Sequence, residues 1–186
     1  MCRVFIAADI YRKNELQKVQ QNLISYLNLE IRNLKLVLPE NFHFTLVFFG
    51  EVNNSILDKI VTKISEIEFQ SFEINYGTIG AFPNNNHAKV VWIGLDGATK
   101  RAFNQMAYKV ISKLIELDIK LEKEIEKEII PHITLFRTKK VSLNLNLHDV
   151  ESGYAISDRI DTISVKKSMT TPQGPIYENI ICVKGK

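Results

Sequence analysis

The chain has 186 residues, of which 45% are hydrophobic, and this is enough apolar material for a sizeable core in one compact domain or in two small lobes that share an interface. Its 24 lysines and arginines exceed its 21 aspartates and glutamates only slightly, so the net charge is +3. This composition argues against a disordered chain and against a broad surface that coats nucleic acid, and any phosphate site must be local.

The chain carries no sign of a disulfide framework or of a membrane segment. Its two cysteines, Cys2 and Cys182, are far apart in the sequence and form no CxxC pair. The N-terminus lacks the features of a signal peptide, and no apolar run approaches the roughly 18 residues that a membrane span needs. We therefore expect a soluble, cytoplasmic protein that does not bind membranes.

Hydrophobic periodicity divides the first part of the chain into strands and helices. Short β-prone stretches predict strands, and apolar residues at helical spacing predict amphipathic helices. A break at residues 37–41 separates the first helix from the next strand, which ends at Gly50. The predicted elements are a strand at 3–9, a helix at 14–27, a strand at 43–49, and a helix at 54–67 with Asn54 or Ser55 as its N-cap.

The rest of the chain predicts further strands around one long helix. The expected elements are a strand at 69–76, a Gly/Pro/Asn-rich turn at 77–86, a strand at 89–95, a helix at 98–117, a strand from His132, and strands at 154–157, 160–168 and 176–183. Several successive strands are joined too tightly for parallel crossovers, which favours an antiparallel α+β arrangement. Because a helix precedes a histidine-bearing strand in each half, an internal duplication is a hypothesis.

Two tetrapeptides share the form His, apolar, Thr, apolar. They are His43-Phe44-Thr45-Leu46 and His132-Ile133-Thr134-Leu135, and their histidines lie 132 − 43 = 89 positions apart. Side chains alternate across a strand, so His43 and Thr45 should face one side while their apolar neighbours face the other. The same holds for His132 and Thr134. Each strand is therefore predicted to present one polar pair to a cleft and one apolar pair to a core.

Two imidazoles and two hydroxyls across a shared groove would suit a phosphodiester. Cleaving a phosphodiester needs a base for the attacking oxygen and an acid for the leaving oxygen, and histidine can serve in either role. Threonine hydroxyls can donate hydrogen bonds to the non-bridging oxygens as their charge increases. His43 and His132 are therefore the predicted catalytic residues, and Thr45 and Thr134 are predicted to bind the substrate.

Other candidates are less sharply defined by the sequence. Arg137 lies five positions after His132, on the opposite face of a regular strand, but a bulge or the strand end would let it reach the phosphate. Phe48 lies near the end of the first motif strand and is a candidate for stacking on a base. His87 and His148 are expected in exposed loops. No HxxxH, CxxC or compact Asp cluster occurs, so we predict neither a catalytic metal nor a cofactor.

The paired motifs and their surroundings resemble the RNA 2′,3′-cyclic phosphodiesterases, historically called 2′-5′ RNA ligases, of the two-histidine phosphoesterase superfamily. The resemblance spans nearly the whole chain and is carried by residues 3–7, 39–52, 91–95, 131–137 and 172–178. It implies a bilobal α+β fold of the LigT-like type over residues 1–186, as a single domain. Two antiparallel sheets with flanking helices would surround a central cleft, related by a pseudo-twofold axis.

The resemblance also implies roles for the site residues. His43 would give a proton to the leaving 3′ oxygen, and His132 would activate water, which yields a terminal 2′-phosphate. Thr45 and Thr134 would hold the phosphate with help from Arg137. In the reverse direction a ribose hydroxyl would replace water and form a 2′-5′ bond, with acid and base exchanging roles.

Two alternatives remain open at this point. One is a phosphodiesterase that acts on a small nucleotide, and the other is a non-catalytic RNA-binding module. Intact His and Thr in both motifs argue against a pure binding module, because binding alone needs no matched acid and base. The expected partner is RNA with 2′,3′-cyclic phosphate ends, for which tRNA fragments are one candidate source, and the expected state is a monomer.

Overall fold

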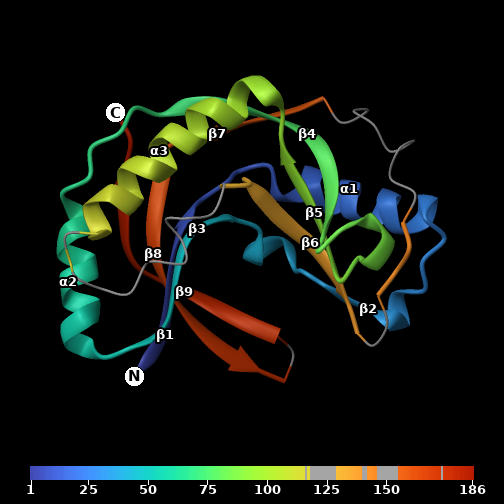
Figure 1. Ribbon diagram of the computed structural model, residues 1–186, viewed down its shortest axis with the longest axis horizontal. Coiled ribbons are helices and arrows are strands. Elements are labelled where there is room, and N and C mark those ends of the chain that lie inside the picture. The colour runs from blue at the N-terminus through green and yellow to red at the C-terminus, as the bar shows by residue number, and fades with distance from the viewer. Residues whose placement is uncertain (116, 118–128, 140–141, 146–154, 173) are drawn as a thin grey trace.

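The computed structural model describes residues 1–115, 117, 129–139, 142–145, 155–172 and 174–186. Its strands form two antiparallel sheets (Figure 1). The four-stranded sheet has the order β3 (Phe44–Val52), β1 (Cys2–Ala8), β8 (Thr162–Thr171), β9 (Gly174–Lys184). The five-stranded sheet has the order β2 (Leu34–Leu36), β6 (His132–Thr138), β5 (Val90–Leu95), β4 (Phe72–Phe82), β7 (Ile156–Ile160).

Each sheet is covered by a helix that follows a strand of the other sheet. Helix α1 (Lys13–Tyr26) follows β1 but packs against β6, whereas α3 (Gly97–Ile115) follows β5 but packs against β3. Helix α2 (Asn54–Ser65) lies beside α3 and β9 (Figure 1). The order β1–α1–β3 in one lobe therefore matches β5–α3–β6 in the other. This confirms the expected bilobal, pseudo-twofold α+β fold.

The buried side chains of both sheets and of α1, α2 and α3 form one hydrophobic cluster. The amphipathic pattern of α1 buries Leu16, Val19 and Leu23, as the sequence predicts. In α3 the buried face includes Phe103, Val110 and Leu114. The two lobes therefore share one core and pack directly against each other.

Two local expectations were wrong. The N-cap of α2 is Asn53, whose Oδ1 accepts a hydrogen bond from the Ile56 backbone N–H at 2.9 Å, and not Asn54 or Ser55. The expected turn at 77–86 begins later, because β4 continues to Phe82. Gly80 permits this continuation, since a Cβ there would lie 2.2 Å from the Trp92 ring.

The remaining differences concern the ends of helices and strands and a few short elements that were not predicted. The strands expected at 154–157 and 160–168 are β7 and β8, which are separated at Asp161. The short edge strand β2 was not predicted, and three short 3-10 turns, at Ile31–Asn33, Pro39–Asn41 and Asn85–His87, complete the described elements. Among the described residues, no helix combines the length and apolar character needed to cross a membrane.

Candidate active site

The two motifs meet at a cavity of about 320 Å³ between the sheets. Residues of β1, β3, β8 and β9 line it on one side, and residues of β2 and β6 line it on the other. All six site residues predicted from the sequence line this cavity: His43, Thr45, Phe48, His132, Thr134 and Arg137. The fold therefore brings together two motifs that are 132 − 43 = 89 positions apart.

Strand pairing explains how Phe48 reaches the cavity. In the β1–β3 pair, Ala7 is opposite Thr45 but Ile6 is opposite Val47, so Leu46 has no partner and forms a bulge. Leu46 and Val47 are consecutive and both buried. Without this extra residue the alternation would turn Phe48 to the core side; with it, Phe48 shares the cavity side with Thr45.

The second motif has a bulge at the same position. In the β5–β6 pair, Trp92 is opposite Thr134 but Val91 is opposite Phe136, so Leu135 is the unpaired residue. The bulge lets Arg137 join His132 and Thr134 on the cavity side. Both bulges fall three positions after the histidine, and both place the residue five positions after it at the cavity. Phe48 and Arg137 are thus equivalent under the pseudo-twofold relation.

The two imidazoles are held in the same way. His43 Nδ1 lies 2.7 Å from the carbonyl oxygen of Asn41, and His132 Nδ1 lies 2.8 Å from the carbonyl oxygen of Ile130. A carbonyl can only accept, so each ring carries its proton on Nδ1 and leaves Nε2 as the variable nitrogen. His43 Nε2 lies 3.1 Å from Thr45 Oγ1.

Aromatic rings pack against each imidazole. The His43 ring contacts Phe5 and Tyr177, with centroid distances of 5.0 Å and 5.3 Å. The His132 ring contacts Phe82 at 4.9 Å and Trp92 at 5.9 Å. These contacts restrict ring rotation and remove water from one side of each catalytic candidate.

Burial lowers the pKa of both histidines. Burial is the largest cause that lowers the pKa of His43 to about 4; Lys166 and Lys13 add to this effect, and the Asn41 carbonyl and Asp9 oppose it. Burial likewise lowers the pKa of His132, with a smaller contribution from Arg137. Both rings therefore tend to be neutral at pH 7, and a bound phosphate anion would favour their protonation.

Several lining residues were not chosen from the sequence. Tyr177 and Ser168 come from the β8–β9 hairpin, and Lys35 comes from the unpredicted β2. Tyr177 both packs on His43 and lines the cavity. Only the pairing of β8 with β1 reveals that the hairpin forms a cavity wall.

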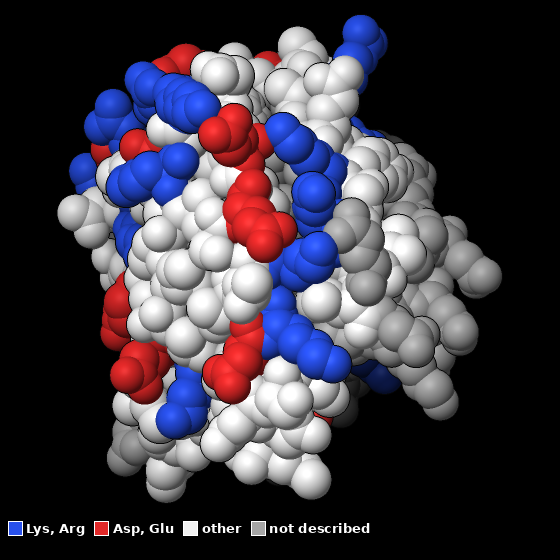
Figure 2. Space-filling view, turned by 90° about the vertical axis from the view of Figure 1, so that its left-hand side faces the viewer, with Lys and Arg blue, Asp and Glu red and all other residues white. Residues whose placement is uncertain are grey.

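The third described histidine, His87, does not line the cavity. His87 is exposed in the turn at Asn85–His87, as expected, and His148 lies outside the described residues. Within the described part of the chain, no three His, Cys, Asp or Glu side chains gather as metal ligands do. Figure 2 shows the face on the left of Figure 1, where basic and acidic side chains intermix and form no broad basic surface.

Comparisons with known proteins agree with this geometry. The LigT like Phosphoesterase family matches residues 13–92. RNA 2′,3′-cyclic phosphodiesterases of Archaeoglobus fulgidus and Methanocaldococcus jannaschii are 31% and 33% identical to the chain. Each match covers 96% of this chain, and 97% and 98% of the relatives.

Solved structures share the fold. A protein of Thermus thermophilus superposes with a TM-score of 0.78 at 20% identity, over 98% of this chain and 97% of its own. The complex of E. coli LigT with 3′-AMP also has a TM-score of 0.78, at 18% identity and the same coverage. At this identity the likeness concerns the architecture, with two antiparallel sheets around a central cavity.

Proposed function

The chain belongs to the family of LigT-like phosphoesterases and RNA 2′,3′-cyclic phosphodiesterases, and from this premise we propose that it hydrolyses RNA 2′,3′-cyclic phosphate ends to 2′-phosphates. One observation carries this proposal above the others. Two His-x-Thr motifs face one cavity, and the Nδ1 atom of each histidine is held by a carbonyl two residues earlier. Such a pair can supply both proton transfers of the reaction, so the proposed mechanism uses no metal.

We propose that His132 acts as the general base and His43 as the general acid. His132 Nε2 takes a proton from water while the water oxygen attacks phosphorus. The bond from phosphorus to the 3′ oxygen breaks, and this oxygen takes the proton held on His43 Nε2. Thr45, Thr134 and Arg137 would bind the non-bridging oxygens, on which negative charge increases in the transition state.

The low pKa of His43 places a condition on this role. A ring with a pKa of about 4 carries little positive charge at pH 7. The substrate phosphate is an anion, and its approach to the ring favours the protonated form. We therefore propose that His43 takes up its proton together with the substrate. The reverse reaction, in which a ribose hydroxyl forms a 2′-5′ bond, would use the same groups with acid and base exchanged.

Hydrolysis of a short RNA that ends in a 2′,3′-cyclic phosphate tests the proposal. The assay compares wild type, His43→Ala and His132→Ala in EDTA, and the position of the product phosphate is mapped. We expect a 2′-phosphate from wild type and a loss of about 10²–10⁴-fold in each variant, the usual size of an acid or base contribution. A folded but inactive wild type would instead favour the RNA-binding module or the phosphodiesterase that acts on a small nucleotide.

The size of the cavity supports a second candidate. A volume of about 320 Å³ is at the lower end for small-molecule sites, so a small nucleotide with a cyclic phosphate would fill it without an RNA chain. Comparing kcat/KM for a cyclic mononucleotide and for a five-nucleotide RNA separates the two. A gain of tenfold or more for the RNA would indicate contacts beyond the cavity, and equal values would favour the small nucleotide.

Both motifs of the proposed site come from the same chain, so the site needs no second subunit, and we propose a monomer as the working unit. The shared core likewise supports one bilobal domain over residues 1–186. Among RNA substrates, tRNA fragments with cyclic ends are one candidate, and such ends would be met in the cytoplasm. A sedimentation measurement at assay concentration checks the monomer.

A further inference from the structure

A second cavity, of about 390 Å³, lies on the other side of His43. It shares His43 and Tyr177 with the cavity that holds the two motifs. Its remaining wall contains two acidic and two basic side chains, which the proposed reaction does not use. The lining residues are Asp9, Lys13, Glu40, Phe42, His43, Lys166, Tyr177 and Asn179.

Strand pairing places two of these charges close to the imidazole. Ala8 at the end of β1 is opposite Phe44 at the start of β3. Asp9 directly follows β1 and His43 directly precedes β3, so these two residues lie side by side at the same end of the sheet. Phe5, whose ring packs on His43, is opposite Lys166 in β8. Asp9 and Lys166 thus approach His43 from two neighbouring strands.

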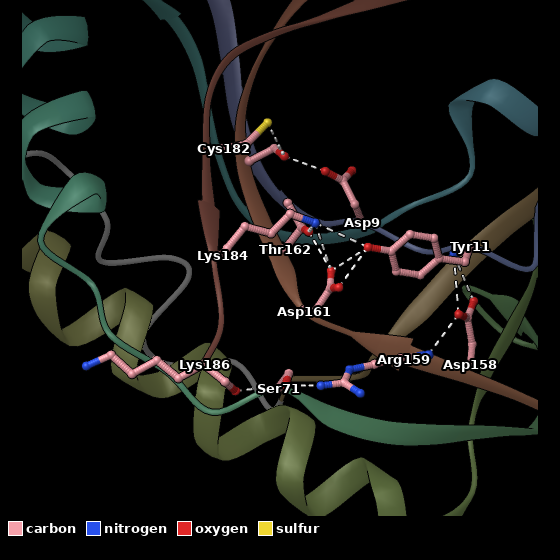
Figure 3. Close-up of polar contacts among 11 residues, drawn as sticks. Asp9, Tyr11, Ser71, Asp158, Arg159, Asp161, Thr162, Cys182, Lys184 and Lys186 are labelled. Atoms are coloured by element: carbon pink, nitrogen blue, oxygen red, sulfur yellow. Dashed lines mark hydrogen bonds and ion pairs between the residues drawn. The ribbon is translucent and has the colours of Figure 1, made fainter.

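Asp9 and Lys166 form a largely buried ion pair. Lys166 Nζ lies 2.7 Å from Asp9 Oδ1, and the Lys166 and Asp9 side chains are 10% and 25% exposed. Lys166 Nζ also donates to Asn179 Oδ1 at 2.6 Å, and Ser164 Oγ donates to the second oxygen of Asp9. Figure 3 shows Asp9 near Cys182 and, lower in the view, the separate ion pair Asp161–Lys184, whose Nζ and Oδ1 atoms are 3.3 Å apart. Burying two charges is costly, so this pair needs an explanation other than stability.

We propose that the Asp9–Lys166 ion pair is a positioning element that sets how readily His43 takes up a proton. Asp9 favours the imidazolium and Lys166 opposes it, and their pairing holds the two effects in balance. Removing one partner would leave an uncompensated charge beside the ring. This role rests on the proposed function, because it takes His43 as the general acid.

The direction of each effect is consistent with the charges around His43. Lys166 lowers the pKa of His43 and Asp9 raises it. The other titratable groups that line the two cavities around the ring stay unchanged in the variants that test the proposal, so they provide a constant background. They are Lys13 of α1, Glu40 of the turn at Pro39–Asn41, Lys35 of β2, His132 and Arg137 of β6, and Tyr177 of β9.

The decisive measurement is an NMR titration of the His43 ring, assigned with His43→Gln, in the protein without substrate. Lys166→Met leaves the Asp9 carboxylate unpaired beside the ring. This opposite charge should raise the pKa of His43 by about 1 or more. Asp9→Asn should keep the ring neutral down to the lowest pH at which the protein is folded. The double variant Asp9→Asn/Lys166→Met should return close to wild type, as should Lys166→Arg, which keeps the charge.

A matched pair elsewhere provides the control. Asp161 and Lys184 are also an Asp–Lys pair on the β8–β9 side, at 3.3 Å, but neither lines a cavity that contains His43. Asp161→Asn and Lys184→Met should therefore leave the pKa of His43 unchanged. Shifts of the same sign in both single variants at Asp9 and Lys166, or no shift in folded protein, would overturn the role.

The outcome stays decisive if one variant does not fold, because each single variant has its own required direction. The titration needs no RNA, so it can succeed or fail independently of the activity assay. If wild type hydrolyses cyclic ends, the limb of the kcat/KM pH profile that belongs to His43 should move in the same direction as the NMR value. A purely structural ion pair would change the melting temperature without moving this limb.

Discussion

At the scale of single residues, the site depends on which nitrogen of each imidazole is free. Main-chain carbonyls hold Nδ1 in both motifs, so Nε2 is the atom left to exchange protons. The two rings then differ in their surroundings rather than in their orientation. His43 is flanked by Phe5 and Tyr177, and His132 by Phe82 and Trp92. Because the two rings are held in the same way, a change in the substrate's leaving group is needed to tell the acid from the base.

A change of leaving group tests that assignment. With sulfur in place of the 3′ bridging oxygen, the leaving thiolate needs no proton, because a thiol is far more acidic than an alcohol. We expect His43→Ala to recover most of its lost rate on this substrate, while His132→Ala stays impaired. The ratio of rates on the sulfur and oxygen substrates measures this for each protein. Recovery in His132→Ala alone would reverse the two roles.

Phe48 is expected to contribute binding and little chemistry. Its side chain is 49% exposed at the cavity, which is unusual for a phenylalanine and suits stacking on a base. Phe48→Ala should raise KM about tenfold with kcat nearly unchanged, since stacking on one base contributes about 1–3 kcal/mol. Steady-state kinetics on RNA measures both constants.

The neighbouring Phe49 is a matched control. It packs against the core and is absent from the cavity lining. Phe49→Ala should lower the free energy of unfolding and leave KM close to wild type. If both variants raise KM equally, the effect of Phe48→Ala comes from a disturbed strand and not from stacking.

At the scale of elements, two bulged strands select the residues that reach the cavity. A regular strand after His43 or His132 would turn the residue five positions later toward the core. The unpaired Leu46 and Leu135 reverse this and bring Phe48 and Arg137 to the cavity. One lobe thus offers an aromatic side chain and the other a guanidinium at equivalent positions.

Hydrogen bonds to Asp158 of β7 connect the start of α1 to the five-stranded sheet. Its carboxylate accepts hydrogen bonds from the backbone N–H groups of Tyr11 and Arg12 and from the Tyr76 hydroxyl, and the contact to Tyr11 is visible in Figure 3. Asp158→Ala leaves these donors without their acceptor, so we expect the free energy of unfolding to fall by about 3 kcal/mol. Urea unfolding measures it.

The N-cap of α2 gives the comparison for that variant. Asn53 bonds one exposed backbone N–H, so Asn53→Ala should cost about 1 kcal/mol. Asn53→Ser should restore most of this loss. Equal losses in Asp158→Ala and Asn53→Ala would mean that the buried carboxylate contributes no more than an exposed cap.

At the scale of the whole molecule, the buried site should make stability depend on pH. The pKa of His43 is about 4 in the folded chain and near 6.5 when unfolded, so the unfolded chain binds more protons between these values. Stability therefore rises with pH through this window and is lost as pH falls from about 6.5 to 4. Protonation of His43 should lower the free energy of unfolding by about 3 kcal/mol over this window.

Urea unfolding of wild type and His43→Gln at pH 7 and pH 4.5 measures this contribution. On acidification, the free energy of unfolding of His43→Gln should fall by about 2–3 kcal/mol less than that of wild type, because the variant has no ring to protonate. Carboxylates contribute equally to both proteins and cancel in the difference. Identical losses would show that the His43 ring is no harder to protonate in the folded chain.

The sequence by itself determined the paired motifs and the local pattern of helices and strands, and from them it predicted the residues of the site. The two His-x-Thr motifs, the amphipathic helices and the short strands are local patterns with periods of 2 or 3.6 residues, so they can be read without a fold. The sequence also predicted that Arg137 would reach the phosphate only through a bulge or at the end of the strand.

Only the tertiary structure decided where the two bulges fall, that the β8–β9 hairpin forms a cavity wall, and that Asp9 meets Lys166 behind His43. The physical reason is that these features depend on pairing between strands far apart in the sequence. A shift of one residue in such a pairing moves a side chain from the core to the cavity without any change in the local pattern.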